Sequence, residues 1–227
     1  MLAVSGYFLS SCENCLEGNG KMSSKTVKIG EITRIKLSAD ANVILVNDSG
    51  TTLKIEGESN IIEAFEFKES DHSLKIRTEP CIRNHEAVTI TIPVKALEML
   101  TINGSGNFKS NSALRATDVE LMVNGSGNID LQLDAVNIEN QINGSGSILL
   151  KGTAQRQKTV INGSGNLEAA DFAAGKVQVT INGSGDCKVW ATTSLSVNVR
   201  GSGNVYYKGA PDVSTNVKGS GSVEKMP

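Results

Sequence analysis

Apolar and polar residues alternate with a period of two through the second half of the chain. In residues 119–123, 177–181 and 195–199 every second residue is Val, Leu or Ile, and most of the residues between them are polar. Such alternation predicts strands that bury one face. Shorter alternating runs, separated by turn-forming clusters, occupy residues 26–100. The pattern therefore predicts an all-β fold.

The tripeptide Gly-Ser-Gly divides the second half into repeats of 18–21 residues. An aliphatic residue precedes each tripeptide by two positions, and a second core-type residue follows that aliphatic residue by six. Asparagine stands directly before the first five copies, and Arg or Lys before the last two. The tripeptides begin at Gly104, Gly125, Gly144, Gly163, Gly183, Gly201 and Gly219. Because a fixed period over half of a chain is typical of stacked repeats, we expect a solenoid.

A unit of two short strands in about 19 residues cannot bury its apolar face alone. Parallel, in-register stacking of successive units solves this problem and gives a β-helix with rungs about 4.8 Å apart. Its coiling should be right-handed, as parallel crossovers nearly always are. A β-propeller is disfavoured because each blade needs about 40 residues. The sequence thus predicts a right-handed, single-stranded β-helix with rungs of about 18–21 residues and an irregular N-terminal half.

The repeated Asn-Gly-Ser-Gly motif fits the corner of such a rung. Glycine tolerates positive φ and lets neighbouring rungs approach closely. Stacked asparagine amides and serine hydroxyls are expected to hydrogen-bond from rung to rung. A phosphate-binding loop is disfavoured, because the third glycine of Gly-x-Gly-x-x-Gly is missing from all seven copies.

The patterns divide the chain into three parts. Residues 1–12 are a signal segment, residues 13–25 a flexible tether and residues 26–227 a β-helix domain. Within that domain we expect residues 26–100 to form irregular rungs that cap one end, and residues 101–227 to form the regular rungs. The last rung is either a frayed, charged end or a contact with another subunit in a homo-oligomer.

The first twelve residues end in Leu-Ser-Ser-Cys, which resembles a bacterial lipobox. Lipidation of Cys12 would anchor the protein to a membrane, and the polar residues 13–25 would then form the tether. No basic residue precedes Cys12, and this departure favours a start further upstream. The alternative is a short apolar strand or frayed terminus with a chance cysteine.

Different roles are expected for the other three cysteines. Cys15 and Cys81 could pair in an oxidising compartment, which the sequence leaves open. Cys187 falls on a core position of the repeat, so a buried and inert thiol is expected. Cys12 and Cys15 have the spacing of a zinc or redox pair, but no second pair or histidine follows them. No metal or cofactor site is predicted.

Composition narrows the function classes. The 227 residues include 22 Lys and Arg against 24 Asp and Glu, which gives a net charge of −2 and no basic footprint for nucleic acid. An apolar share of 39% is too high for a disordered chain. The longest apolar stretch, residues 1–9, is too short to span a bilayer.

Repeated Ile-Asn-Gly-Ser-Gly-Asn motifs behind a lipobox and an irregular β-rich segment resemble the "putative auto-transporter adhesin, head GIN domain" family of bacterial envelope proteins. The resemblance covers residues 26–227. It implies a right-handed β-helix and an exported, lipid-anchored protein of the outer membrane that faces the periplasm or the surface. It brings no catalytic residues.

We therefore expect a non-enzymatic envelope lipoprotein, either an adhesin or a β-helix that binds glycan or protein. Period-two alternation places Trp190 and Tyr206 on the outer face beside Lys188 and Lys208. Aromatic rings beside polar groups can stack on a sugar. The alternative is that these rings shield the terminal rungs.

Two other functions stay open. The fold class could host a polysaccharide lyase or hydrolase, but no two acids adjoin in the outward row after the corners, and no catalytic residue is predicted. That row reads Lys109, Asp130, Leu149, Glu168, Lys188, Tyr206 and Glu224. A site could still lie in the irregular half, around Asp40, Asp48, Asp71 and His85. The third possibility is a structural component of an envelope assembly.

Overall fold

The computed structural model describes residues 15–79 and 81–227, and the fold is 70% strand and 2% helix. The N-terminal elements are β1 (Leu16–Glu17), β2 (Met22–Lys28), β3 (Arg34–Ser38), β4 (Asn42–Val46), β5 (Thr52–Glu58), α1 (Ser59–Glu63), β6 (Phe65–Ser70), β7 (Ser73–Thr78), β8 (Ile82–Arg83) and β9 (Thr89–Pro93). The others are β10 (Met99–Gly104), β11 (Asn107–Ser110), β12 (Leu114–Gly125), β13 (Asn128–Gly144), β14 (Ser147–Gly163), β15 (Asn166–Gly183), β16 (Cys187–Gly201), β17 (Val205–Lys208), β18 (Asp212–Gly219) and β19 (Val223–Lys225).

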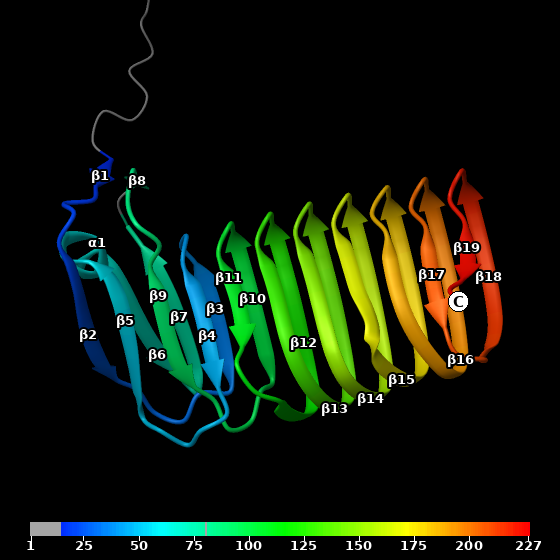
Figure 1. Cartoon of the computed structure of the whole chain (residues 1–227), viewed down its shortest axis with the longest axis horizontal. Coiled ribbons are helices and arrows are strands. Elements are labelled where there is room, and N and C mark those ends of the chain that lie inside the picture. Colours follow the sequence, from blue (N-terminus) through cyan, green and yellow to red (C-terminus); the bar gives the residue numbers. More distant parts are fainter. Residues whose placement is uncertain (1–14, 80) are drawn as a thin grey trace, which may run out of the picture.

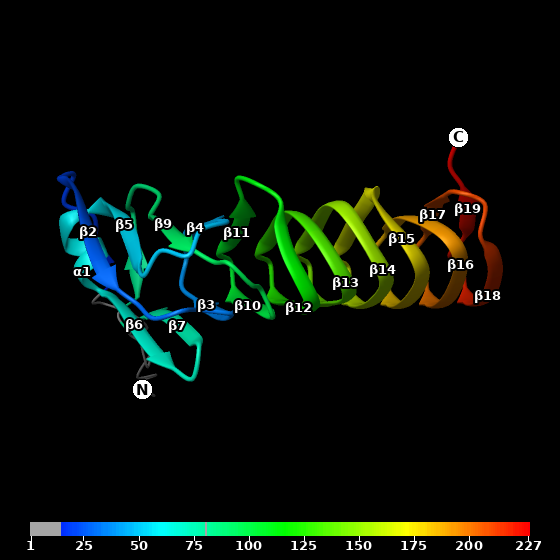
Figure 2. The ribbon, with the colours of Figure 1, turned by 90° about the horizontal axis from the view of Figure 1, so that it is seen from below.

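From β10 onward the chain winds as a β-solenoid, within a fold of about seven turns with rungs of about 19 residues. Each strand pairs in parallel with its counterpart on the next rung. The seven Gly-Ser-Gly corners lie in one column, in which Gly104 pairs with Gly125 and the series continues to Gly219. The strand tips follow one edge in Figure 1, and Figures 1 and 2 together show right-handed coiling. The predicted β-helix is confirmed.

The inward residues on both sides of the corner form the core. Those before the corner stack in register and are fully buried from β12 to β16: Val123, Ile142, Ile161, Ile181 and Val199. Those after the corner are buried as well: Phe108, Ile129, Ile148, Leu167, Cys187 and Val205. Cys187 is a free, buried thiol, as predicted, and burial raises its pKa. The thiol is therefore protonated and unreactive at neutral pH.

From the second corner onward, the first glycine of each corner has no room for a side chain. At Gly163, where φ is +129°, a Cβ atom would lie 2.5 Å from the carbonyl oxygen of Gly144 on the preceding rung. Asparagine amides donate to the preceding rung at 2.8–3.0 Å, as predicted, in the pairs Asn124–Asn103, Asn143–Asn124, Asn162–Asn143 and Asn182–Asn162. The corner serines contribute through backbone N–H groups, such as Ser164 to Gly144 at 3.0 Å, and not through the predicted hydroxyls.

In the N-terminal half the rungs are not stacked in chain order. The rung formed by β3 and β4 pairs in parallel with β10 and β11 on one side, and with β7 and β9 on the other. The chain therefore adds its second rung outside the first and then crosses back to begin β10. Strands β2, β5 and β6 pair antiparallel and, with α1, cover the N-terminal end (Figure 1).

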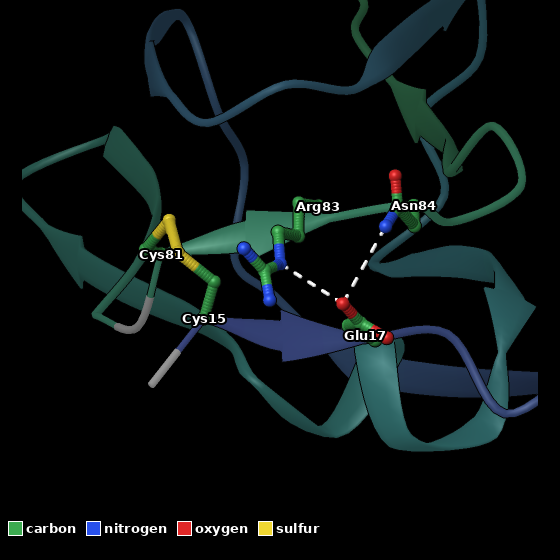
Figure 3. The surroundings of a disulfide bond; sticks show 5 residues. All are labelled: Cys15, Glu17, Cys81, Arg83 and Asn84. Atoms are coloured by element: carbon green, nitrogen blue, oxygen red, sulfur yellow. Dashed lines mark hydrogen bonds and ion pairs between the residues drawn. A yellow bond between two sulfur atoms is a disulfide. The ribbon is translucent and has the colours of Figure 1, made fainter. Parts of the chain in front are cut away.

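The segment predicted as a flexible tether is ordered from Cys15 onward, so that prediction is wrong for residues 15–25. A disulfide joins Cys15 to Cys81, with a Cα–Cα distance of 4.6 Å. Strand β1 pairs with β8, and Arg83 donates to the Glu17 carboxylate at 2.9 Å (Figure 3). The polar composition that indicated a tether instead supplies hydrogen bonds to the cap.

Glu58 holds the same segment from the other side. Its side chain is buried, and its carboxylate accepts hydrogen bonds from the backbone N–H groups of Glu86, at 2.9 Å, and of Gly20. These two bonds lower the pKa of Glu58. The signal segment and its lipidation candidate Cys12 lie outside the described residues.

Candidate functional site

The structure brings the four residues of the predicted aromatic patch together. Lys188 pairs with Tyr206, and Trp190 with Lys208, on the adjacent strands β16 and β17. Trp190 is 38% exposed. The buried residues of β16 alternate with these positions, so all four side chains lie on the outer face.

Both lysines of this patch already have acidic partners. Lys188 forms an ion pair with Glu168 at 3.0 Å, and Lys208 with Asp171 at 3.6 Å. Lys208 also donates to the backbone carbonyl of Ala170 at 3.2 Å. The side chains around Trp190 are therefore held in place, but part of their hydrogen-bonding capacity is used within the protein.

A larger feature, which the sequence reasoning missed, is a groove of about 1230 Å³ along one flank of the solenoid. It crosses the rungs from the loop after β9 and from β10 to β16, parallel to the solenoid axis. Two outward rows of side chains line it, both from the strand segments that lead into the corners. The first row is Asp118, Asn137, Arg156, Lys176 and Ser194. The second row is Glu120, Glu139, Lys158, Gln178 and Ser196.

Charge changes sign along the groove. Asp118, Glu120 and Glu139 outnumber Arg115 in the part over β12 and β13, which is therefore acidic. Arg156, Lys158 and Lys176 make the part over β14 and β15 basic. The part over β16 is lined by serines. The end near β10 is lined by Arg34, Lys95 and Glu98. An elongated partner would therefore meet sections of different charge along the groove.

Few of these charges are neutralised within the protein. Lys158 pairs with Glu139 at 2.6 Å, and Asn137 donates to Asp118 at 2.6 Å. Among the described residues, Glu120 and Lys176 form no ion pair. These two side chains are available to a ligand at opposite ends of the charged section.

A buried polar cluster lies in the rungs below the groove. Asn140 and Gln157 each donate to the Thr159 hydroxyl, at 3.2 and 3.5 Å, inside a column that is otherwise aliphatic. The side-chain carbonyl oxygens of Asn140 and Gln157 have no partner within the described protein. Each such oxygen costs about 1–3 kcal/mol.

The outward row after the corners is in register as expected, with Glu168 beside Lys188 and Tyr206 beside Glu224. In the outward row before the corners two acids do adjoin, since Glu120 pairs with Glu139. Aligning the repeats on their glycines and reading this second outward column would have revealed the groove. Alternation is therefore sufficient to predict the outward rows on both sides of the corner.

Three of the four residues singled out in the irregular half contact groups of the protein, each a different one. The Asp48 carboxylate accepts a hydrogen bond from the backbone N–H of Ser49 at 2.7 Å. Asp71 pairs with Arg34 at 3.1 Å, and a ring nitrogen of His85 contacts the carbonyl oxygen of Glu86. In residues 15–79 and 81–227, no three His, Cys, Asp or Glu side chains gather closely enough to hold a metal ion.

The coiled fold and its groove define a class, the β-solenoid with a long open groove along one flank. Within that class, the family model described as "Putative auto-transporter adhesin, head GIN domain" matches residues 31–211. The chain belongs to this family. The family resemblance seen in the sequence is thereby confirmed, and it indicates a surface or envelope protein with an adhesin-like role.

Solved structures agree with this family assignment. A putative adhesin from Bacteroides fragilis NCTC 9343 is 28% identical with a TM-score of 0.89, over 93% of this chain and 100% of that one. A putative lipid binding protein from Parabacteroides distasonis ATCC 8503 is 25% identical with a TM-score of 0.79, over 94% and 100%. A putative adhesin from Parabacteroides merdae ATCC 43184 is 25% identical with a TM-score of 0.75, over 93% and 99%.

No curated protein matches the sequence. Among the residues that the structure describes, no helix is long and apolar enough to cross a membrane.

Proposed function

We propose that this protein is a lipid-anchored envelope adhesin without enzymatic activity, and that its groove binds an extended polypeptide segment of a partner protein. The observation that carries the proposal is the groove itself, which runs across successive rungs and is open along its length. A partner in an extended conformation could contact each rung in turn, about every 4.8 Å.

The change in the sign of the charges along the groove favours a polypeptide over a glycan. One extended peptide can present a basic residue to Glu120 and an acidic residue to Lys176, whereas the charges of an acidic glycan are all negative. The groove lining also contains no aromatic residue. Stacking on a sugar ring, the usual contribution of aromatic side chains in glycan sites, is therefore not available there.

The disulfide and the family support the location in the envelope. Structural disulfides persist in oxidising compartments such as the periplasm and the cell surface. Cys12, the proposed lipidation site, precedes the disulfide-bonded Cys15 by only three residues. A lipid at Cys12 would thus hold the capped N-terminal end of the solenoid close to the membrane, and the groove would be carried on the solenoid beyond it.

The Parabacteroides neighbour described as lipid binding raises a lipid ligand as an alternative. Acidic and basic side chains line both rows of the groove in this chain, and acyl chains gain little from such a surface. We therefore place the lipid at Cys12 rather than in the groove.

Binding of the Cys12→Ser protein to peptide and glycan arrays would test the groove. We expect binding to peptides of mixed charge, and a loss of at least about tenfold in the Arg156→Ala/Lys176→Ala variant, since two charge-assisted contacts are each worth about 1.5–3 kcal/mol. The matched control is Lys109→Ala/Lys225→Ala, which removes two lysines from outside the groove. Equal loss in the control, or unchanged binding in the groove variant, would overturn the proposal.

The aromatic patch is a second candidate site, because Trp190 is exposed beside three polar or aromatic neighbours in one array. A sugar ring stacked on Trp190 would bind through the glycan arm of the same experiment. Trp190→Ala/Tyr206→Ala should abolish glycan binding and leave peptide binding intact. If glycan binding survives in this variant, the patch is not a glycan site.

The adjoining acids Glu120 and Glu139 are the observation that a hydrolase hypothesis would use. Glycosidases need two carboxyl groups on either side of the scissile bond. A reducing-sugar assay on pectic and host glycans, with Glu120→Gln as control, tests it. Turnover that disappears in Glu120→Gln would replace the adhesin proposal with an enzyme, whereas the structural-component alternative predicts neither turnover nor array binding.

A further inference from the structure

The C-terminal end of the solenoid presents an uncovered edge strand. All eight residues of β18 are exposed, and in the described part of the chain only β16 pairs with it. Val213 and Val217 stand in register with the buried Leu195 and Val199, so they face inward, yet they are 42% and 38% exposed. An edge strand with free N–H and C=O groups and apolar inward residues is a template for pairing with another strand.

The sequence of β18 is complementary to itself when read in the opposite direction. In an antiparallel pair centred on Thr215, Asp212 lies opposite Lys218 of the second copy, and Val213 opposite Val217. Ser214 then lies opposite Asn216. Every pair joins residues on the same face of the sheet, since directly opposite residues in antiparallel strands share a face.

We propose that two copies of this chain form a two-fold symmetric dimer through antiparallel pairing of β18, centred on Thr215. Two Asp212–Lys218 pairs would lie on the outer face, and two Val213–Val217 pairs would continue the apolar core across the interface. Opposite charges and apolar pairs both stabilise facing strands, by about 0.2–1 kcal/mol for each pair. Such an isologous contact closes on itself and gives a dimer rather than a fibre.

The arrangement has a consequence for adhesion, which depends on the function proposed above. The capped N-terminal end lies opposite β18 along the solenoid axis (Figure 1). In the dimer the two N-terminal ends, and with them the proposed lipid anchors, lie at the two far ends of one rod. Chains on two apposed membranes could therefore join through their tips.

A charge-swap experiment tests the dimer. The Cys12→Ser chain should sediment as a dimer at tens of micromolar concentration. Asp212→Lys alone and Lys218→Asp alone should each weaken dimerisation by about tenfold or more, because each replaces two attractions by two repulsions. A mixture of the two single variants, and the Asp212→Lys/Lys218→Asp double variant, should both recover the dimer.

Val217→Lys should also give a monomer, since it places a charge in the apolar part of the interface. Its unfolding temperature should stay close to that of the parent, because Val217 is already well exposed. A parent chain that is monomeric up to about 1 mM, species larger than a dimer, or swap variants that do not complement each other would overturn the proposal.

Vesicles that carry the chain by an N-terminal attachment test the bridging separately. Vesicles with Asp212→Lys should cluster only when mixed with vesicles that carry Lys218→Asp. A solution dimer without such clustering would refute the bridge between membranes, and peptide-array binding would still report on the groove independently.

Discussion

The two ends of the solenoid are built differently although one core runs through both. At the N-terminal end, antiparallel strands, a short helix and a disulfide cover the outermost rung. At the C-terminal end the regular repeat continues to β18, whose residues are all exposed. A repeated unit propagates a stack but carries no signal to end it, so a cap must come from residues that break the repeat. The irregular half supplies one, and the regular half instead ends in a self-complementary strand.

The largest effect on the free energy of unfolding is expected at a corner of the regular half. Gly163→Ala and Gly104→Ala impose the same strain of positive φ, at +129° and +118°, which costs about 1–3 kcal/mol. Only at Gly163 would the new Cβ also approach a carbonyl oxygen of the preceding rung, which adds about 1–3 kcal/mol. Urea unfolding should show the larger loss for Gly163→Ala. Equal losses would mean that contact between rungs does not require these glycines.

The next largest effect on the free energy of unfolding is expected at the capped N-terminal end. Replacing Cys15 and Cys81 by serine opens a loop with a sequence separation of 66 residues and should lower the free energy of unfolding by about 2–4 kcal/mol. Chemical unfolding with and without a reducing agent measures this loss. The reducing agent should destabilise the parent but leave the double serine variant unchanged. A parent that is insensitive to reduction would show that the cap does not depend on this bond.

A gain of stability is expected inside the regular half. Asn140→Leu, Gln157→Val and Thr159→Val together restore the aliphatic columns and remove two unpartnered oxygens. We expect the free energy of unfolding to rise by about 1–3 kcal/mol. The Ser145→Ala variant, at an exposed corner, serves as a control that should change little. A loss of stability in the triple variant would show that the cluster is favourable as it stands.

The smallest effect is a pH dependence of the cap. Backbone hydrogen bonds lower the pKa of Glu58 below its ordinary value of 4.5. Its contribution to stability is therefore present above that value and is lost as the pH falls through the lower, folded-state pKa. The protection factors of the β1 and β2 amides, which compare each exchange rate with the intrinsic rate at the same pH, should fall on acidification in the parent. In Glu58→Gln they should be lower and less pH-dependent. Identical pH profiles for the parent and Glu58→Gln would show that Glu58 does not stabilise the cap.

The corners and the core could be predicted because each depends on local pattern. Positive φ selects glycine at Gly163, and alternation places Ile161 inside, whatever lies elsewhere in the chain. The aromatic patch around Trp190 followed from the same rule. The alternation rule also predicts the two outward rows that line the groove, but only after all rungs have been aligned on the corners.

Other features could not be derived in this way. The order of the first rungs, in which β3 pairs with both β7 and β10, involves partners far apart in the sequence. The disulfide and the bonds of Glu58 turned an expected tether into part of the cap. Both depend on which distant segments meet.

The sequence by itself determined that this chain is a β-solenoid, since its period, its alternation and its glycine corners admit only stacked coils. Tertiary structure alone decided how the stack begins and that β18 remains uncovered. The physical reason is that periodic patterns record which face of a strand is buried, whereas pairing between non-repeating segments is fixed only when the whole chain is assembled.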